Sequence, residues 1–303
     1  YRNVHLIVTE DAHVPVWGTQ VITPVVKTEY AKVTLHTQLV VPEGQTFRDY
    51  SAETELLDNK GRVVARNRTT GTNYDEETFR QDFVVVKPAL WSPDSPTLYT
   101  ANTRIFYKDT TLKDEYTTVF GIRSVEVAPG KGFLLNGERV QIKGVCNHHD
   151  LGPLGAAVNE AAIRRQIRIL KDMGCNAIRT SHNMPAPELV KACDEIGMMV
   201  MAESFDEWAT AKLENGYHAE FNEWAEKDIE NLVRHFRNNP SVVMWSIGNE
   251  VPDQWNVSSA SKLAYFLQSV CHREDPTRPV TVGMNSHEAA IKHQMAAVMD
   301  IAG

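Results

Sequence analysis

The sequence has few cysteines, no long apolar run and no excess of positive charge, and each shortage excludes a class of protein. Only four of the 303 residues are cysteine, and no CxxC pair or zinc-type Cys/His spacing occurs. We expect reduced thiols, because a chain of this length builds a core that does not need disulfides. The longest apolar run, around residues 196–202, is far shorter than the roughly 18 residues that cross a bilayer, which argues against a membrane partner. The formal charge of −8 argues against a nucleic-acid partner.

The remaining composition is that of folded protein. Apolar residues make up 42% of the chain and charged residues 23%, and the length allows two domains or one domain and part of another. The chain begins at Tyr1, and nothing in the sequence indicates a compartment.

The first 127 residues show the alternation typical of β-strands. Residues 31–41 read AKVTLHTQLVV, and the turn Asp58-Asn59-Lys60-Gly61 separates two short strands in a hairpin pattern. Further strands are predicted over residues 79–86, 98–107 and 116–127. About seven strands without a helical period predict an immunoglobulin-like β-sandwich over residues 27–127. Residues 1–9 also predict a strand, and we interpret residues 1–26 as the last strand of an upstream jelly-roll domain plus a linker.

After residue 128 the pattern changes to strands that alternate with helices. Strands are predicted at 140–145, 177–180, 198–202, 242–247, 279–283 and 298–302, and helices at 159–173, 187–196, 220–238 and 258–273. The third helix is expected to turn Trp224, Ile229, Leu232, Val233 and Phe236 inward. Strict alternation predicts a parallel sheet, and no Gly-rich phosphate loop follows the first strand.

A (β/α)₈ barrel fits this order best, because such barrels place polar groups at the carboxyl ends of successive strands. The sequence predicts five strands and the start of a sixth, whereas a closed barrel needs eight. Residues 128–303 are therefore predicted to form the first part of a TIM barrel. Open strand edges would favour association with a second copy, so a homo-oligomer is one expected partner state.

Glu250 is the sharpest candidate for chemistry. It follows the apolar run of residues 242–247 and stands beside Asn249. A carboxyl group at a barrel mouth, partly desolvated by apolar walls, would have a raised pKa and could protonate a leaving oxygen. The alternative is a surface glutamate that begins a loop.

Two other strand ends carry polar clusters. Arg179 could hold a carboxylate in place, and His182 could hydrogen-bond a sugar hydroxyl, or both could belong to a salt-bridged turn. His148 and Asp150 follow the first strand. They fit hydroxyl binding better than metal ligation, because adjacent histidines point to opposite sides of an extended segment. A loop with ordinary polar contacts is the alternative there.

The third strand ends in the acidic stretch Glu203-Ser-Phe-Asp206-Glu207-Trp208. One of its carboxylates could bind a divalent cation or position a substrate, although most acidic runs are solvated surface. Trp208 could stack on a sugar or pack in the core.

Five stretches together resemble one known family, the family 2 glycoside hydrolases, which include β-galactosidases, β-glucuronidases and β-mannosidases. They are LWSPDSPTLY (residues 90–99), FGIR (120–123), FLLNGERVQIKGVCNHHD (133–150), NAIRTSHNMP (176–185) and SVVMWSIGNE (241–250). The resemblance covers nearly the whole chain. It implies a sugar-binding jelly roll, an immunoglobulin-like domain and a catalytic barrel.

The resemblance also implies roles for individual residues. Glu250 would be the general acid/base and Asn249 the partner of the sugar 2-hydroxyl. Arg179 would neighbour the nucleophile, and His182 and His148 would line the pocket. The nucleophile of the family is a glutamate on the seventh strand, which this sequence does not reach. The implied activity is retaining hydrolysis of terminal β-linked sugars.

The family pattern is not complete at the third strand. Some galactosidases of the family hold a magnesium ion there with a glutamate and a histidine two residues apart. Glu207 matches the glutamate, but Ala209 stands in place of the histidine, so we expect no metal and no other cofactor. Glu207 is instead taken as a substrate-binding residue.

The stretches around His148 and Glu207 look most like those of galactosidases. They favour a β-galactosidase over a β-glucuronidase or β-mannosidase. A non-catalytic carbohydrate-binding or interaction module is the alternative from another functional class.

Overall fold

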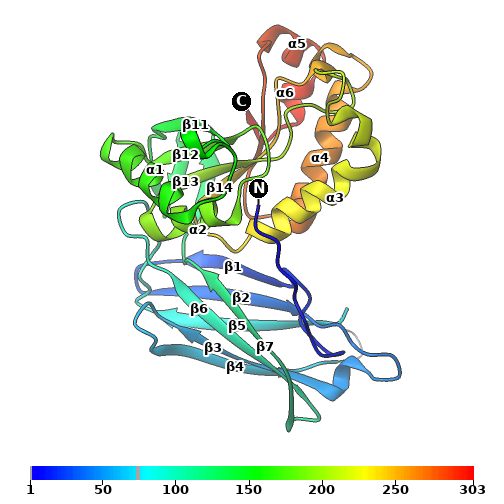
Figure 1. Ribbon diagram of the computed structural model, residues 1–303. Helices are drawn as coiled ribbons and strands as arrows, with labels where there is room; N and C mark the ends of the chain where they lie inside the picture. The colour runs from blue at the N-terminus through cyan, green and yellow to red at the C-terminus, as the bar shows by residue number, and fades with distance from the viewer. Residues whose placement is uncertain (1, 73–75) are drawn as a thin grey trace.

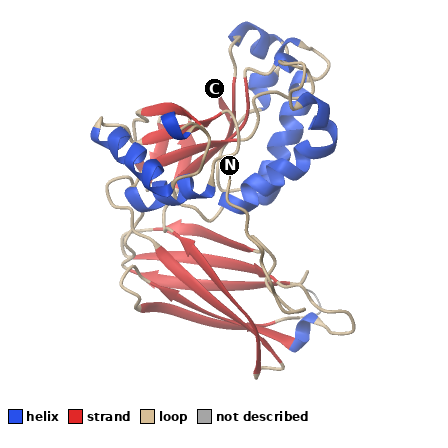
Figure 2. Cartoon of the chain, viewed as in Figure 1, coloured by secondary structure: helices blue, strands red, loops and turns tan. Residues whose placement is uncertain are grey.

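The chain has two parts, a β-sandwich and a parallel sheet covered by helices, in the computed structural model, which describes residues 2–72 and 76–303 (Figure 1). Figure 2 shows that the sandwich consists almost entirely of strands and loops, whereas the other part combines strands with helices. Among the described residues, every helix is too short or too polar to cross a lipid bilayer.

Within the described residues, seven antiparallel strands form the sandwich; six of them lie in the predicted range 27–127, and the first precedes it. They are β1 (Thr19–Val26), β2 (Tyr30–Gln38), β3 (Tyr50–Leu57), β4 (Val63–Thr70), β5 (Thr78–Val86), β6 (Tyr99–Tyr107) and β7 (Thr111–Phe120). One sheet has the order β1-β2-β5 and the other β4-β3-β6-β7. Alternate residues fill the space between them: Val33 and Leu35 of β2 are fully buried and share an apolar cluster with Leu56 of β3.

The structure corrects the interpretation of the first 26 residues. Residues 2–9 form no strand, and Tyr1 lies outside the described residues. Residues 19–26, expected to be linker, form β1 and pair with β2. Pro24 lacks the N–H that a strand ladder uses, and a register irregularity between Ile22 and Val25 accommodates it. The upstream jelly-roll domain stays a prediction.

A small antiparallel sheet connects the two parts. It consists of β8 (Val125–Ala128), β9 (Gly132–Leu135) and β10 (Glu138–Arg139), so the single strand predicted over residues 116–127 is wrong. β7 ends before Gly121, where a side chain would come within 2.6 Å of Pro240. Phe133 and Leu135 cluster with Trp91 and with residues at the start of the parallel strands, which closes the amino-terminal end of that sheet.

Six parallel strands lie side by side in chain order, as in the first part of a (β/α)₈ barrel. They are β11 (Gly144–His148), β12 (Ala177–Ser181), β13 (Met199–Glu203), β14 (Val242–Asn249), β15 (Val280–Gly283) and β16 (Ile301–Ala302). The helices are α1 (Glu160–Asp172), α2 (Pro187–Ile196), α3 (His218–Phe236), α4 (Ala260–Glu274), α5 (His287–Lys292) and α6 (Met295–Val298). The sheet is open within the described residues, with β11 and β16 at its edges. The predicted incomplete barrel is confirmed.

Local signals set the helix ends well. The Asn159 side chain accepts a hydrogen bond from the Ala162 N–H and caps α1. Gly197 ends α2 in a left-handed conformation with φ 85°. A side chain at Gly197 would also lie 2.2 Å from the Pro93 carbonyl oxygen of the sandwich. Both the backbone angle and the lack of space therefore require glycine at this position.

Two predictions about the barrel part are wrong. The first parallel strand was expected over residues 140–145 but covers Gly144–His148, because the backbone of β12 provides partners only from Gly144 onward. Trp224 was expected to point inward but is 42% exposed, with the Lys227 ammonium over its ring. The helical period instead turns Phe221 and Ala225 toward the core.

The sandwich contacts the barrel part through buried polar groups. Arg123, which follows β7, donates to the carbonyls of Pro240 and Val242 at 2.6 Å each. The Trp91 indole donates to the Asp194 carbonyl at 2.9 Å. Residues of the FGIR and LWSPDSPTLY motifs thus join the sandwich to the barrel part.

Asp194 gives the fold a dependence on pH. Its buried carboxylate accepts hydrogen bonds from the Ser241 N–H and the Asn239 side chain. Burial raises the pKa of Asp194 from 3.8 to about 6, although these hydrogen bonds lower it. The folded state therefore holds this proton more tightly than the unfolded chain. The stability that this gives is complete below pH 3.8 and is lost as the pH rises through about 6.

The variant Asp194→Asn should lack this pH dependence. We expect the free energy of unfolding of the variant minus that of wild type to increase by about 3 kcal/mol between pH 4 and pH 7, since two pKa units correspond to that amount. Thermal unfolding at a series of pH values measures this difference, with the exposed Asp172→Asn as the matched control. Parallel stability curves for wild type and Asp194→Asn would contradict the prediction.

Candidate active site

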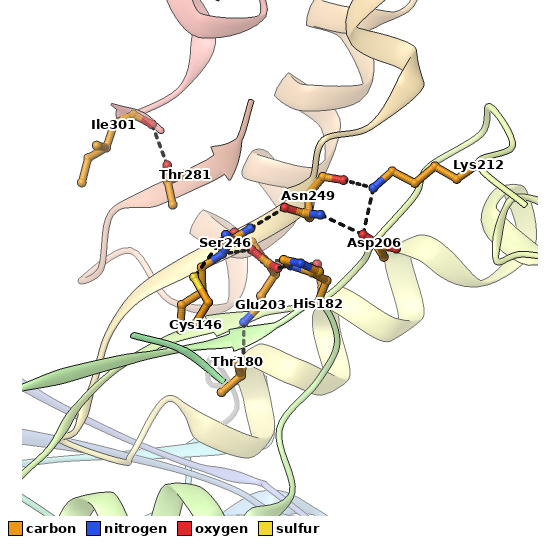
Figure 3. A network of polar contacts seen from close by, with 12 residues as sticks. Cys146, Thr180, His182, Glu203, Asp206, Lys212, Ser246, Asn249, Thr281 and Ile301 are labelled. Carbon is orange, nitrogen blue, oxygen red and sulfur yellow. Dashed lines mark hydrogen bonds and ion pairs between the residues drawn. The ribbon is translucent and has the colours of Figure 1, made fainter. Parts of the chain in front are cut away.

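Polar side chains share one face of the parallel sheet at the carboxyl ends of its strands. Alternate residues of a strand point to opposite faces, and the helices cover only one of these faces. The register places Glu203 of β13 opposite Ser246 of β14, and Ser246 opposite Thr281 of β15. Figure 3 shows Glu203 and Ser246 in a connected network of polar contacts, whereas Thr281 contacts only Ile301 among the residues drawn.

Glu203 is the centre of this network. Its side chain is fully buried and accepts hydrogen bonds from Arg179 Nε at 2.7 Å, Ser246 Oγ at 2.6 Å and His182 Nδ1 at 2.7 Å. Burial lowers the pKa of Arg179, but the hydrogen bond and the charge of Glu203 outweigh that effect and leave it above its ordinary value. Arg179 is therefore a permanent cation at this site, and three donors fix the carboxylate of Glu203.

Asn249 is held at both ends of its amide group. Its Oδ1 accepts from Arg179 Nη2 at 2.8 Å, and its Nδ2 donates to Asp206 Oδ1 at 2.9 Å. Burial raises the pKa of Asp206, but hydrogen bonds from Lys212 and Asn249 outweigh it, so the net pKa is lowered and the carboxylate stays ionised. The structure thus brings together three of the predicted residues, Arg179, His182 and Asn249.

Glu250 lies at the carboxyl end of β14, where the sequence predicted it. Its N–H donates to the Gly283 carbonyl at 2.7 Å, so the backbone lies between the ends of β14 and β15. Its side chain is exposed, and the predicted enclosure by apolar walls is wrong for the described residues. The reason is the open sheet, which leaves this rim in contact with solvent.

The two residues predicted from the end of the first strand have different surroundings. His148 ends β11, and its ring meets the His182 ring edge-on with 5.0 Å between centroids. Asp150 accepts a hydrogen bond from the Gly152 N–H at 2.6 Å and stabilises a turn outside the network. Its role in sugar binding stays a prediction.

Glu207 organises a loop. One of its oxygens accepts from the His218 N–H and ring Nδ1 at 2.7 and 2.9 Å, and the other from the Lys212 and Leu213 N–H groups at 2.7 and 3.4 Å. Burial raises the pKa of Glu207, but these hydrogen bonds outweigh it and lower the pKa.

This environment does not fit a magnesium ion of the kind that some galactosidases of the resembled family hold after the third strand. Both oxygens of Glu207 face N–H hydrogens, whereas a magnesium ion requires oxygen donors in octahedral geometry. Ala209 supplies no ligand. The loop already uses both oxygens of Glu207. The substrate-binding role predicted for this residue stays a prediction.

From the sequence, Glu207 is preferred to Glu203 and Asp206 within the acidic stretch, and neither Lys212 nor Ser246 is predicted. A signal did exist for Glu203, since it ends the apolar strand MVMAE on the same face as Met199 and Met201, where an unpaired carboxylate would be costly. No such signal existed for Lys212, which reaches the network from an irregular loop.

A cavity of about 540 Å³ adjoins this network. His182 and Asp206 line it, together with Glu207, Tyr217 and Arg2. Glu250 is not among the lining residues, but Asp206 connects the cavity to Asn249 through their hydrogen bond. The cavity therefore opens at the carboxyl ends of β12 and β13.

Comparisons with known proteins agree with this geometry. Residues 14–123 match the model of glycosyl hydrolases family 2, and residues 125–301 match the TIM barrel domain of that family. A β-galactosidase of Bacteroides ovatus is 42% identical over all of this chain and 39% of its own length. A putative β-glucuronidase of Formosa agariphila is 39% identical over 80% of this chain and 22% of its own length.

A solved structure agrees as well. A crystal structure of a glycosyl hydrolase family 2 member from Bacteroides cellulosilyticus has a TM-score of 0.91 at 35% identity, over 97% of this chain and 38% of that one. The chain thus spans about two fifths or less of these relatives. Both of its parts match the family in order and in structure, and the chain belongs to glycosyl hydrolase family 2.

Proposed function

We propose that this chain carries the acid/base half of the active site of a retaining β-galactosidase. The observation that supports this most directly is the position of Glu250 at the end of β14, next to Asn249, whose amide is held by Arg179 and Asp206. A carboxyl group there can protonate a glycosidic oxygen while the fixed amide binds a sugar hydroxyl. His182 and His148 are proposed to line the same sugar site.

The second carboxylate of the reaction is proposed to come from a strand beyond the six described here. It would attack the anomeric carbon, at about 5–5.5 Å from the carboxyl group of Glu250. Arg179, on β12, is proposed to orient that carboxylate. Glu250 would then act as the base that activates water for the second step.

The charge of the cavity favours a neutral sugar over a uronic acid. Three carboxylates line it, from Asp206, Glu207 and Asp228. The guanidinium group of Arg2 also lines it but donates to the carbonyls of Met184 and Pro185. A uronate would bring a further negative charge into this environment, which supports galactoside over glucuronide as substrate.

The test uses the complete protein that contains this chain and a panel of nitrophenyl β-glycosides. We expect kcat/KM for the galactoside to exceed that for the glucuronide by about 10²-fold, because an opposed like charge costs several kcal/mol. A preference for the glucuronide would contradict the choice of sugar. Absence of turnover on every β-glycoside would contradict the proposed activity.

The exposure of Glu250 is the observation that favours the second candidate, a non-catalytic sugar-binding module. Such a module would bind galactose in isothermal titration calorimetry and hydrolyse none of the panel. Turnover that depends on Glu250 would exclude it.

A further inference from the structure

The peptide bond between Asn249 and Glu250 is held from both sides. Glu250 has φ 47°, in the left-handed region that a residue with a side chain adopts only when its surroundings impose it. Its N–H donates to the Gly283 carbonyl at 2.7 Å, and the preceding carbonyl, that of Asn249, accepts from Lys212 Nζ at 2.6 Å (Figure 3). Gly283 thus holds the N–H of this peptide, and Lys212 holds its carbonyl.

The constrained backbone of Glu250 sets the direction of its Cα–Cβ bond, from which the carboxyl group extends. Within residues 2–72 and 76–303, no side chain hydrogen-bonds to that carboxylate, and the side chain is exposed. A change in the backbone angles of residues 249 and 250 would therefore move the proton donor directly. Proton transfer in catalysis requires heavy atoms within hydrogen-bond distance, so a small displacement has a large effect on rate.

Lys212 is itself fixed at both ends. Its backbone N–H donates to Glu207 Oε2 at 2.7 Å, and His218 holds the other oxygen of Glu207. Its ammonium donates to Asp206 Oδ1 at 2.8 Å as well as to the Asn249 carbonyl. Asp206 in turn accepts from the Asn249 side chain, so Lys212, Asp206 and Asn249 form a closed ring.

We infer that Lys212 is a positioning residue for the proton donor Glu250, a role that rests on the proposed function. The loop organised by Glu207 delivers the ammonium, and the ammonium holds the Asn249 carbonyl. Without the ammonium, the left-handed backbone of Glu250 relaxes, and the carboxyl group moves out of hydrogen-bond distance of the glycosidic oxygen. The residue touches neither the sugar nor the reacting atoms in this role.

The test compares Lys212→Met with wild type in the complete protein, on phenyl and 2,4-dinitrophenyl β-galactosides. Phenolate requires protonation to leave, whereas dinitrophenolate does not. We expect kcat/KM for the phenyl substrate to fall about 10²-fold, as for a misplaced catalytic group, and kcat/KM for the dinitrophenyl substrate to change little. Lys212→Arg keeps a cation at this position and should recover most of the lost activity.

Lys227→Met, on the exposed face of α3, is the matched control and should behave as wild type. If Lys212→Met does not fold, as judged by circular dichroism, Lys212→Gln carries the same expectation. Equal losses on both substrates, or no loss on either, would overturn the positioning role while the proposed activity stands. A wild-type protein without β-galactosidase activity would overturn both.

Discussion

Replacing Glu250 with glutamine should lower kcat/KM for aryl galactosides with poor leaving groups by about 10²- to 10⁴-fold, the range that general acid catalysis contributes. The amide of glutamine has nearly the shape of the carboxyl group but cannot supply the proton that phenolate needs. A dinitrophenyl substrate needs no proton in the first step, so its kcat/KM should remain near the wild-type value. The measurement is steady-state kinetics of the complete protein with both substrates.

The second step offers an independent check on Glu250→Gln. Water attacks the glycosyl-enzyme only with a base, whereas azide is a nucleophile that needs none. Added azide should therefore accelerate turnover of the dinitrophenyl substrate by the variant and yield a β-galactosyl azide. Glu223→Gln, an exposed change on α3, is the matched control. Equal losses on both substrates without an azide effect would rule out the acid/base role.

The variant Glu203→Leu should destabilise the protein by about 3–5 kcal/mol, because it removes one partner of a buried ion pair and leaves the other uncompensated. Arg179 would keep its charge, because a guanidinium stays protonated in proteins, and Ser246 and His182 would lose their acceptor. Urea titration followed by circular dichroism measures the change.

Activity should fall as well, by about 10²-fold or more, because Arg179 and Asn249 would lose their fixed orientation. The double variant Glu203→Leu with Arg179→Met should recover much of the stability, since it removes both charges, but none of the activity. Glu195→Gln breaks a surface ion pair with Arg164 and should cost about 1 kcal/mol or less. If Glu203→Leu proves no more costly than Glu195→Gln, Glu203 is not the centre of the network.

The two carboxylates illustrate different limits of sequence reasoning. Glu250 could be located from the sequence because an apolar strand leads directly to it, and a parallel sheet places every such end on one rim. Its exposure could not be predicted, because enclosure depends on which strands complete the barrel. Glu203 had a weaker signal at the end of its own strand, and its importance emerged only from the register that places it opposite Ser246.

Local patterns in the sequence predicted most elements of this protein, although not β1, which was expected to be linker. Alternation with period two identified the sandwich strands, and local signals such as Asn159 and Gly197 set the helix ends, because these preferences act between residues that are near in the chain. Only the tertiary structure shows that Lys212 reaches Asn249 and that Glu207 accepts hydrogen bonds from its own loop. Such contacts join side chains through the folding of an irregular loop, whose path has no periodic signal in the sequence.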